Sequence, residues 1–188
     1  SNTSGITKIF YPWKQLIEIS GSLKNLIIKP MTYNIKDIRE NKETGFINIK
    51  YQNGYPIIVA AYPNPENDTR RKTVSRDLLR DTIDPVTSIL YLGFLTGIKE
   101  SCNHVINVFD GRRRFNLEYI QIKKNYDEFH CKLKINRIAG YSKKELKKHP
   151  KEGIIILRKL SKNINFYFPS EVKIPLTIGS FYVNLSIK

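Results

Sequence analysis

The sequence is poor in the residues that usually carry chemistry. Its 188 residues include two cysteines, three histidines and one tryptophan. It has no CxxC pair, no histidines at metal-ligand spacing, no glycine-rich phosphate loop and no GxSxG nucleophile motif. We therefore expect no metal, no cofactor and no catalytic residues, and we predict that the protein is not an enzyme.

Long apolar runs are missing as well. The longest cluster, Ser88 to Leu95, is far shorter than the about 20 residues that cross a membrane as a helix. The first residues, SNTSGITKIF, lack a basic segment followed by an apolar one, so no signal peptide is visible. With 40% hydrophobic residues, the chain is expected to fold as a single β-rich domain over residues 1–188.

Acidic residues are scarce relative to basic ones. The 17 Asp and Glu face 32 Lys and Arg, which gives a formal net charge of +15. Such a surface attracts anions, for example nucleic acid, anionic lipid or acidic glycan. However, lysine, isoleucine and asparagine are abundant from end to end, as compositional bias alone would produce. The sequence leaves both explanations open.

The first third of the chain predicts a β-meander. Residues 31–40, 45–52 and 55–62 carry the apolar alternation of strands. Between the last two, Asn53-Gly54 predicts a two-residue type I′ turn, in which both residues need a positive φ. We therefore expect two consecutive hairpins in this region.

A loop and the only helical region follow. Residues 62–72 contain two prolines and have no apolar period, so they predict a loop. The helical region covers residues 74–95 in two pieces, the second with Asp84 as N-cap, Pro85 at its first position and a stop at Gly97. Bulky apolar side chains surround this second piece, so we expect it to lie inside or across a concave sheet.

Strand patterns return after residue 102 and continue to the C-terminal end. Seven such runs are separated by short polar segments: 104–110, 112–123, 128–138, 153–160, 164–168, 171–176 and 180–187. The predicted fold class is mainly β, a strongly curved antiparallel sheet or open β-barrel (half-barrel) meander with one central helical segment near residues 74–95.

Three consecutive arginines follow an Asp-Gly pair in the first of these hairpins. If Asp110 and Gly111 form a two-residue turn, Arg112 opens the second strand opposite the residue that precedes the turn. Alternation along a strand then places Arg113 on the core face and directs Arg112 and Arg114 outward. The arginines are therefore not expected to form one patch.

The arginine run has three interpretations. Since the arginines do not share one face, a nucleic-acid-binding site is disfavoured and a structural turn is favoured. An anion-binding site made by Arg112 and Arg114 remains open. Lys132, Lys134 and the basic segment 143–151 would extend such a surface. No histidine lies near a nucleophile in the sequence, so a catalytic cluster is not indicated.

The two cysteines are candidates for a disulfide. Alternation places both Cys102 and Cys131 on the core face. In regular register they flank Tyr119 at two strand spacings, about 9.6 Å, beyond the about 7 Å limit between bridged Cα atoms. A bridge therefore requires Cys102 to leave the ladder, and its presence would indicate an oxidising compartment.

The segments DPVTSILYL, VFDGRRRFNL and RIAGY, with one cysteine ahead of each of the last two, resemble in order and approximate spacing the exported proteobacterial family catalogued as domain of unknown function 3108. The likeness is greatest to its alphaproteobacterial members. The residues that carry it best, besides the cysteines, are Asp84, Pro85, Asp110, Gly111, Arg113, Gly140 and Tyr141.

The resemblance implies several properties. They are export to a Gram-negative periplasm, a β fold similar to the half-barrels of lipoprotein carriers, and no catalytic residues. It also implies that the signal peptide and the opening strands of the full-length protein precede this sequence. Nucleic acid becomes a less favoured partner, because periplasmic proteins rarely meet it.

Two functional hypotheses follow. The first is a noncatalytic cell-envelope protein whose concave sheet holds a hydrophobic or lipid-like ligand, or a partner protein. If the helix fills the concavity, the protein is instead structural. The second is a polyanion-binding protein that uses Arg112, Arg114, Lys132 and Lys134, and it predicts binding that weakens steeply with salt.

Overall fold

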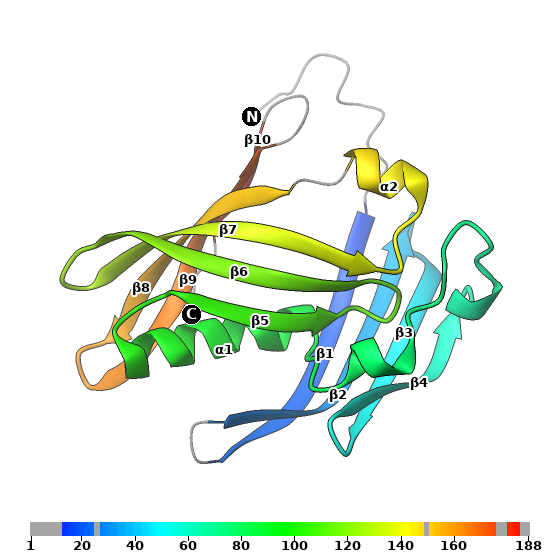
Figure 1. The fold of residues 1–188 in the computed structure, drawn as a ribbon, viewed down its shortest axis with the longest axis horizontal. Coiled ribbons are helices and arrows are strands. Elements are labelled where there is room, and N and C mark those ends of the chain that lie inside the picture. The colour runs from blue at the N-terminus through cyan, green and yellow to red at the C-terminus, as the bar shows by residue number, and fades with distance from the viewer. Residues whose placement is uncertain (1–12, 25–26, 149–150, 176–179, 185–188) are drawn as a thin grey trace.

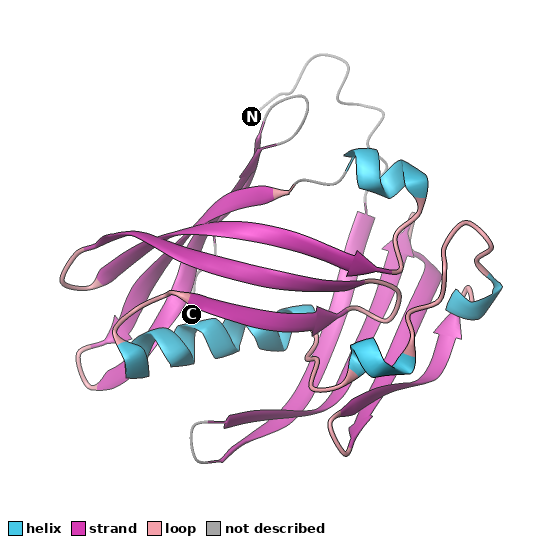
Figure 2. Ribbon diagram, viewed as in Figure 1, coloured by secondary structure: helices cyan, strands magenta, loops and turns pink. Residues whose placement is uncertain are grey.

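The computed structural model describes residues 13–24, 27–148, 151–175 and 180–184. They form two antiparallel sheets (Figures 1 and 2). Sheet A contains, in spatial order, β1 (Trp13–Lys24), β2 (Ile27–Arg39), β3 (Lys42–Gln52) and β4 (Tyr55–Tyr62). Its last three strands are those that the sequence predicted, whereas β1 was not predicted.

Sheet B is a curled half-barrel with the order β10-β9-β8-β7-β6-β5. Its strands are β5 (His104–Phe109), β6 (Arg114–Lys124), β7 (Glu128–Ala139), β8 (Glu152–Ser161), β9 (Ile164–Pro175) and β10 (Ser180–Asn184). The two runs predicted at 164–168 and 171–176 are one strand, β9, up to Pro175. The mainly β, half-barrel fold class is confirmed, and the structure adds the division into two sheets.

The turn Asn53-Gly54 has the predicted form. Both residues have a positive φ, 51° and 79°, and the ladder closes directly behind them with Gln52 paired to Tyr55. The β2–β3 connection is equally tight, because Glu40 and Asn41 also adopt positive φ. Each turn lets alternate side chains of the adjoining strands stay on one face.

The helical region is shorter at its start than predicted and longer at its end. The first piece is only a single 3₁₀ turn, η3 (Arg76–Leu79), after a loop that contains η2 (Pro65–Asn67). The second piece is α1 (Pro85–Lys99), and Asp84 caps it as predicted by accepting the amides of Val86 and Thr87 at 3.0 and 2.8 Å. The helix α2 (Lys143–Lys148) lies further along the chain, between the sheet B strands β7 and β8. None of the described helices is long and apolar enough to cross a membrane.

Gly97 does not end α1, because tertiary packing requires a glycine inside the helix. A Cβ on Gly97 would lie 1.9 Å from the carbonyl oxygen of Asn165, and one on Gly93 would lie 2.0 Å from that of Tyr167. The helix therefore rests backbone to backbone on β9, across the concave side of sheet B (Figure 1). Its small side chains and Leu92 are buried there, and its other bulky side chains are partly buried: Ile89, Leu90, Tyr91, Phe94, Leu95 and Ile98.

Two hydrophobic clusters form the core. One joins α1 to sheet B and includes Leu92, Phe129 and Leu157. The other lies on sheet A, yet it contains Phe109 from the end of β5, which is 4% exposed. The end of the β5–β6 hairpin thus belongs to the core of both sheets and connects them.

Candidate functional site

The face of sheet A that looks toward the rest of the molecule changes from apolar to polar along its strands. Ile17, Ile35, Ile47 and Ala61 are paired in one row across all four strands. The next row toward the end of β2 contains Gln15, Asp37 and Gly45, and Arg39 lies one row further. Rows are about 7 Å apart, because two residues advance a strand by that distance.

A pocket of about 560 Å³ lies on this face. Sheet A forms its floor, with Ile17 and Ile35 among the lining residues. The hairpin tip of sheet B forms one wall, and the start of α1 with Pro85 and Val86 forms another. Its volume falls within the about 300–1,000 Å³ that is typical of small-molecule sites.

The hairpin tip is organised by Asp110. One carboxylate oxygen accepts the amides of Arg112 and Arg113 at 2.9 and 2.7 Å, and the other accepts the Arg113 guanidinium at 2.7 Å. These bonds make a wider turn than predicted, in which Gly111, with φ of 91°, has the positive value and Phe109 pairs with Arg114. The prediction that Phe109 pairs with Arg112 was wrong, because the carboxylate stabilises a four-residue connection.

Arg112 and Arg113 consequently lie in the turn and not in β6. The register is shifted by two residues, so the predicted sharing of faces along β5 and β6 is retained: Val108 pairs with Phe115, and Ile106 with Leu117. Gly111 rests on sheet A, where a Cβ would lie 2.7 Å from Cγ2 of Ile47. This close approach holds the tip over the apolar face.

Gly140 and Tyr141 support the tip from behind. A Cβ on Gly140, whose φ is 81°, would lie 2.0 Å from the carbonyl oxygen of Arg112. The centre of the Tyr141 ring lies 5.9 Å from the Arg113 guanidinium carbon and 5.8 Å from that of Arg137. Two motifs that are distant in the sequence, DGRRR and RIAGY, therefore form one unit in space.

A second group of charges ties this unit to the 62–72 loop. Arg71 donates to Asp68 at 2.8 Å and to both carboxylate oxygens of Glu145. Glu145 also accepts the amide of Ser142 at 2.9 Å, while its own amide donates to the Ser142 hydroxyl, which is the capping box of α2. Burial alone would raise the pKa of Glu145, but these hydrogen bonds and the Arg71 charge lower it to about 2.

Arg112 differs from Arg113 because no carboxylate pairs with it among the described residues. Its guanidinium donates to the carbonyl oxygen of Pro63 at 2.7 Å and borders the pocket. Burial, together with the nearby Arg71 charge, lowers the pKa of Arg112 despite the opposing influence of Asp68 and Asp110. The local environment of Arg112 therefore disfavours its positive charge.

Arg114 lies on the outer face of sheet B, as predicted, but this face is not exposed to solvent there. Its side chain is buried and donates to the carbonyl oxygens of Leu78 and Phe115 at 2.9 and 2.6 Å. The outer face of sheet B is covered here by η3 and sheet A, which the strand alternation could not reveal. Arg112 and Arg114 therefore do not share one surface.

Cys102 and Cys131 lie at disulfide distance and are joined by a bond, with Cα atoms 6.4 Å apart. Cys102 precedes β5 and thus lies outside the ladder, which was the condition for pairing. The expected register around Tyr119 was wrong, because Tyr119 pairs with His104 and Leu133. Both cysteines are fully buried in the core of sheet B.

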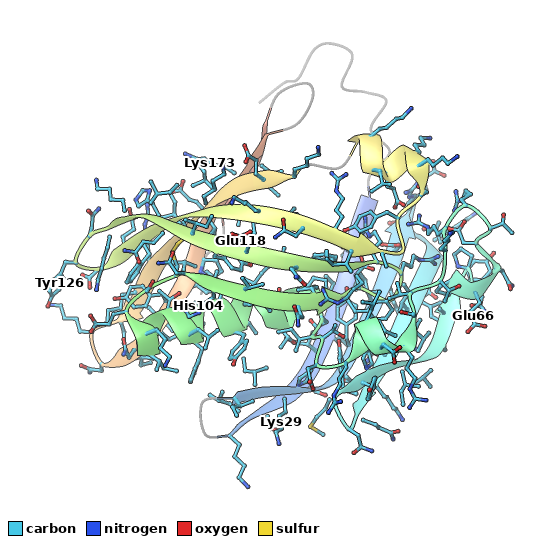
Figure 3. The ribbon with its side chains drawn as sticks, viewed as in Figure 1. Lys29, Glu66, His104, Glu118, Tyr126 and Lys173 are labelled. Atoms are coloured by element: carbon cyan, nitrogen blue, oxygen red, sulfur yellow. A yellow bond between two sulfur atoms is a disulfide. The ribbon has the colours of Figure 1, made fainter. Side chains whose placement is uncertain are left out.

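The other predicted basic residues lie away from the pocket. Lys132 pairs with Glu152 at 2.8 Å, and Lys134 pairs with Glu118 at 3.6 Å. Glu118 is labelled on β6 in Figure 3. In the basic segment 143–151, residues 143–148 form α2, and residues 149–150 lie outside the described residues. Lys132 and Lys134 are thus already engaged with carboxylates.

The described residues contain no group of His, Cys, Asp and Glu side chains that could hold a metal ion. The ring of His104 contacts the carbonyl oxygen of Ser101, and that of His130 contacts Glu128. The pocket is lined by arginines and aspartates together with apolar and amide side chains. This arrangement is suited to binding a ligand.

Sequence reasoning missed several residues of this site. Ile17 and Arg39 do not stand out in the sequence, because the pairing of β1 with β2 is what brings them to one face. Arg71 lies in the segment predicted as a loop, where nothing local indicates its contact with Glu145. The Ser142-x-x-Glu145 pattern is a signal that could have predicted α2 and its capping box.

Comparisons with known proteins give a family but no described function. The family model DUF3108, a protein of unknown function, matches residues 1–185. No curated protein and no solved structure matches the chain.

Proposed function

Since the chain belongs to the DUF3108 family of proteins of unknown function, we propose its function from its geometry: it is a noncatalytic protein that binds the apolar part of a lipid-like ligand on the inner face of sheet A. The observation that carries this proposal is the pocket of about 560 Å³ beside the row of Ile17, Ile35 and Ile47. A row of branched apolar side chains next to open space is suited to an alkyl chain.

Sheet B is not the binding surface in this proposal. Its concave side is occupied by α1, whose Gly93 and Gly97 leave no room between the helix and β9. The half-barrel that the sequence predicted as a ligand groove is thus filled in this part. The ligand-binding hypothesis therefore moves from sheet B to sheet A.

Neighbouring residues of β1 provide a matched test. Ile17 lines the pocket, whereas Leu16 lies on the opposite face, and the two side chains are 40% and 44% exposed. We expect Ile17→Gln to weaken the binding of decanol about tenfold, because the apolar contact with the alkyl chain is lost. Calorimetry measures this affinity. Leu16→Gln should bind like the wild type. Equal effects of both variants, or no binding of decanol by the wild type, would contradict the proposal.

We also propose that residues 1–188 act as one exported domain in an oxidising compartment such as a periplasm. The buried Cys102–Cys131 bond supports this assignment, because such bonds are rare where glutathione and thioredoxin act. A thiol mass-shift assay on protein from its native compartment tests it. Two thiols blocked until reductant is added are expected, whereas two free thiols would argue for a reducing compartment.

Polyanion binding has less support. Arg114 is buried, and Lys132 and Lys134 have carboxylate partners, so these residues do not make one accessible basic surface. Binding to DNA or anionic vesicles that falls steeply with salt would restore this alternative.

A further inference from the structure

The pocket on sheet A combines charged side chains with the apolar row of isoleucines. Three arginines and two aspartates line it: Arg39, Arg112, Arg113, Asp37 and Asp110. Asp37 and Arg39 follow the isoleucine row toward the end of β2, and the Arg112 guanidinium reaches the same end through its bond to Pro63, which lies beside Gly45. Ile35 and Arg39 are four residues apart on β2, which corresponds to about 13 Å.

The charged side chains of the pocket differ in whether another charge already pairs with them. Asp110 and Arg113 neutralise each other through two contacts of 2.7 Å, and Asp37 accepts a hydrogen bond from the side-chain amide of Gln15 at 2.8 Å. Arg112 and Arg39 have no carboxylate partner among the described residues. The residual charge at this end is thus positive, and Arg112 holds it in a half-buried position beside Pro63.

From this distribution we propose that the ligand is an amphiphile with an anionic oxygen headgroup, a carboxylate or a phosphate, which binds Arg112 and Arg39 while its alkyl chain follows the isoleucine row. This inference rests on the proposed function, since it names the ligand class of the same pocket. The anion would supply the opposite charge that Arg112 lacks in its half-buried position.

Four ligands with the same alkyl chain separate the two proposals. Decanoate, decyl phosphate, decanol and decyltrimethylammonium are titrated into the wild-type protein below their micelle concentrations. We expect decanoate or decyl phosphate to bind at least about tenfold more tightly than decanol, as one hydrogen-bonded charge pair would produce. The tighter of the two anions identifies the headgroup chemistry.

Two arginine variants and one control variant test whether Arg112 and Arg39 bind the headgroup. Arg112→Gln and, independently, the exposed Arg39→Gln should each reduce the preference for the anion over decanol by at least about fivefold. The ratio of anion affinity to decanol affinity, measured for each variant, separates the loss of the headgroup contact from a general change of the pocket. Arg80→Gln, an exposed arginine that does not line this pocket, should retain the full preference. Because Arg39 is exposed at a strand end, its variant stays informative if Arg112→Gln fails to fold.

The remaining outcomes are distinct. Decanol binding as tightly as the anions would overturn the headgroup inference and leave the proposed function standing. Tighter binding of decyltrimethylammonium would overturn it in favour of Asp37. If none of the four ligands binds, the proposed function fails and the inference fails with it.

Discussion

The inner faces of the two sheets are covered to different extents. Sheet B buries its face against α1, closes the packing with glycines at the helix surface, and holds β7 to the start of β5 with a disulfide. Sheet A has four strands, and among the described residues the tip of the β5–β6 hairpin, the start of α1 and the turn η3 cover part of its face. Among the described residues, the pocket of about 560 Å³ lies on sheet A, and sheet B is the scaffold that holds the hairpin tip above it.

The largest expected effect comes from removing the residue that joins the sheets. Phe109→Ala should destabilise the protein by about 3–5 kcal/mol, because a buried aromatic ring is replaced by a cavity. Urea unfolding measures this loss. Hydrogen exchange should show that amides of sheet A lose protection before those of sheet B.

Val105→Ala is the matched control for that prediction. Val105 lies on the same face of β5 as Phe109 but is 62% exposed, so its truncation should change stability by about 0.5 kcal/mol or less. If sheets A and B lost protection together in Phe109→Ala, the two would form one cooperative unit, and the distinction between scaffold and binding surface would be weaker.

The disulfide should contribute the next largest effect, and it should act on sheet B. It closes a loop with a sequence separation of 29 residues, for which chain entropy gives about 3.6 kcal/mol. The double variant Cys102→Ala with Cys131→Ala should lose about this much free energy of unfolding. Reduced wild-type protein should behave like it, and decanol binding by the folded fraction should be unchanged. A selective loss of ligand binding would show that the bond shapes the pocket on sheet A.

The contact of α1 with sheet B can be tested at Gly97. Alanine favours a helix by about 1 kcal/mol over glycine, but its Cβ would lie 1.9 Å from the carbonyl oxygen of Asn165. The displacement of α1 from β9 should outweigh this gain in helix propensity. We expect Gly97→Ala to lower the free energy of unfolding in urea by about 1–3 kcal/mol. Leu90→Met, on the half-exposed part of the same helix, should cost less than about 1 kcal/mol. A stabilised Gly97→Ala protein would mean that the helix does not press on β9.

The smallest expected effect is the contribution of the Arg71–Glu145 ion pair, behind the hairpin tip, to stability at acidic pH. The pKa of Glu145 is about 2 in the folded protein against an ordinary 4.5, so its contribution is complete above pH 4.5 and is lost as the pH falls toward 2. We expect Glu145→Gln to remove a contribution on the order of 1 kcal/mol from this window, since the pair is partly solvated. Unfolding curves between neutral and acidic pH measure it.

Glu66→Gln is the control for Glu145. Glu66, labelled in Figure 3, is an exposed carboxylate near the same loop and makes no ion pair among the described residues. Its variant should follow the wild-type pH dependence. If Glu145→Gln did the same, the ion pair with Arg71 would contribute nothing measurable to stability.

Local signals in the sequence predicted local structure well. Asn53-Gly54 specified its turn, because few residues other than glycine and asparagine tolerate positive φ. Asp84-Pro85 specified the start of α1, since both satisfy the needs of the first helical turn. Alternation predicted correctly which residues of β5 and β6 share a face, because strand periodicity survives a register shift of two.

What the sequence determined by itself was therefore the mainly β class, most strand positions, the helix start and the cysteines as a candidate pair. The tertiary structure decided where Arg112, Arg113 and Arg114 point, why Gly97 lies inside a helix, and which sheet keeps an open face. The reason is physical. Turns, caps and alternation depend on neighbours along the chain, whereas the burial of Arg114 and Phe109 depends on sheet A, whose contacts are distant in the sequence.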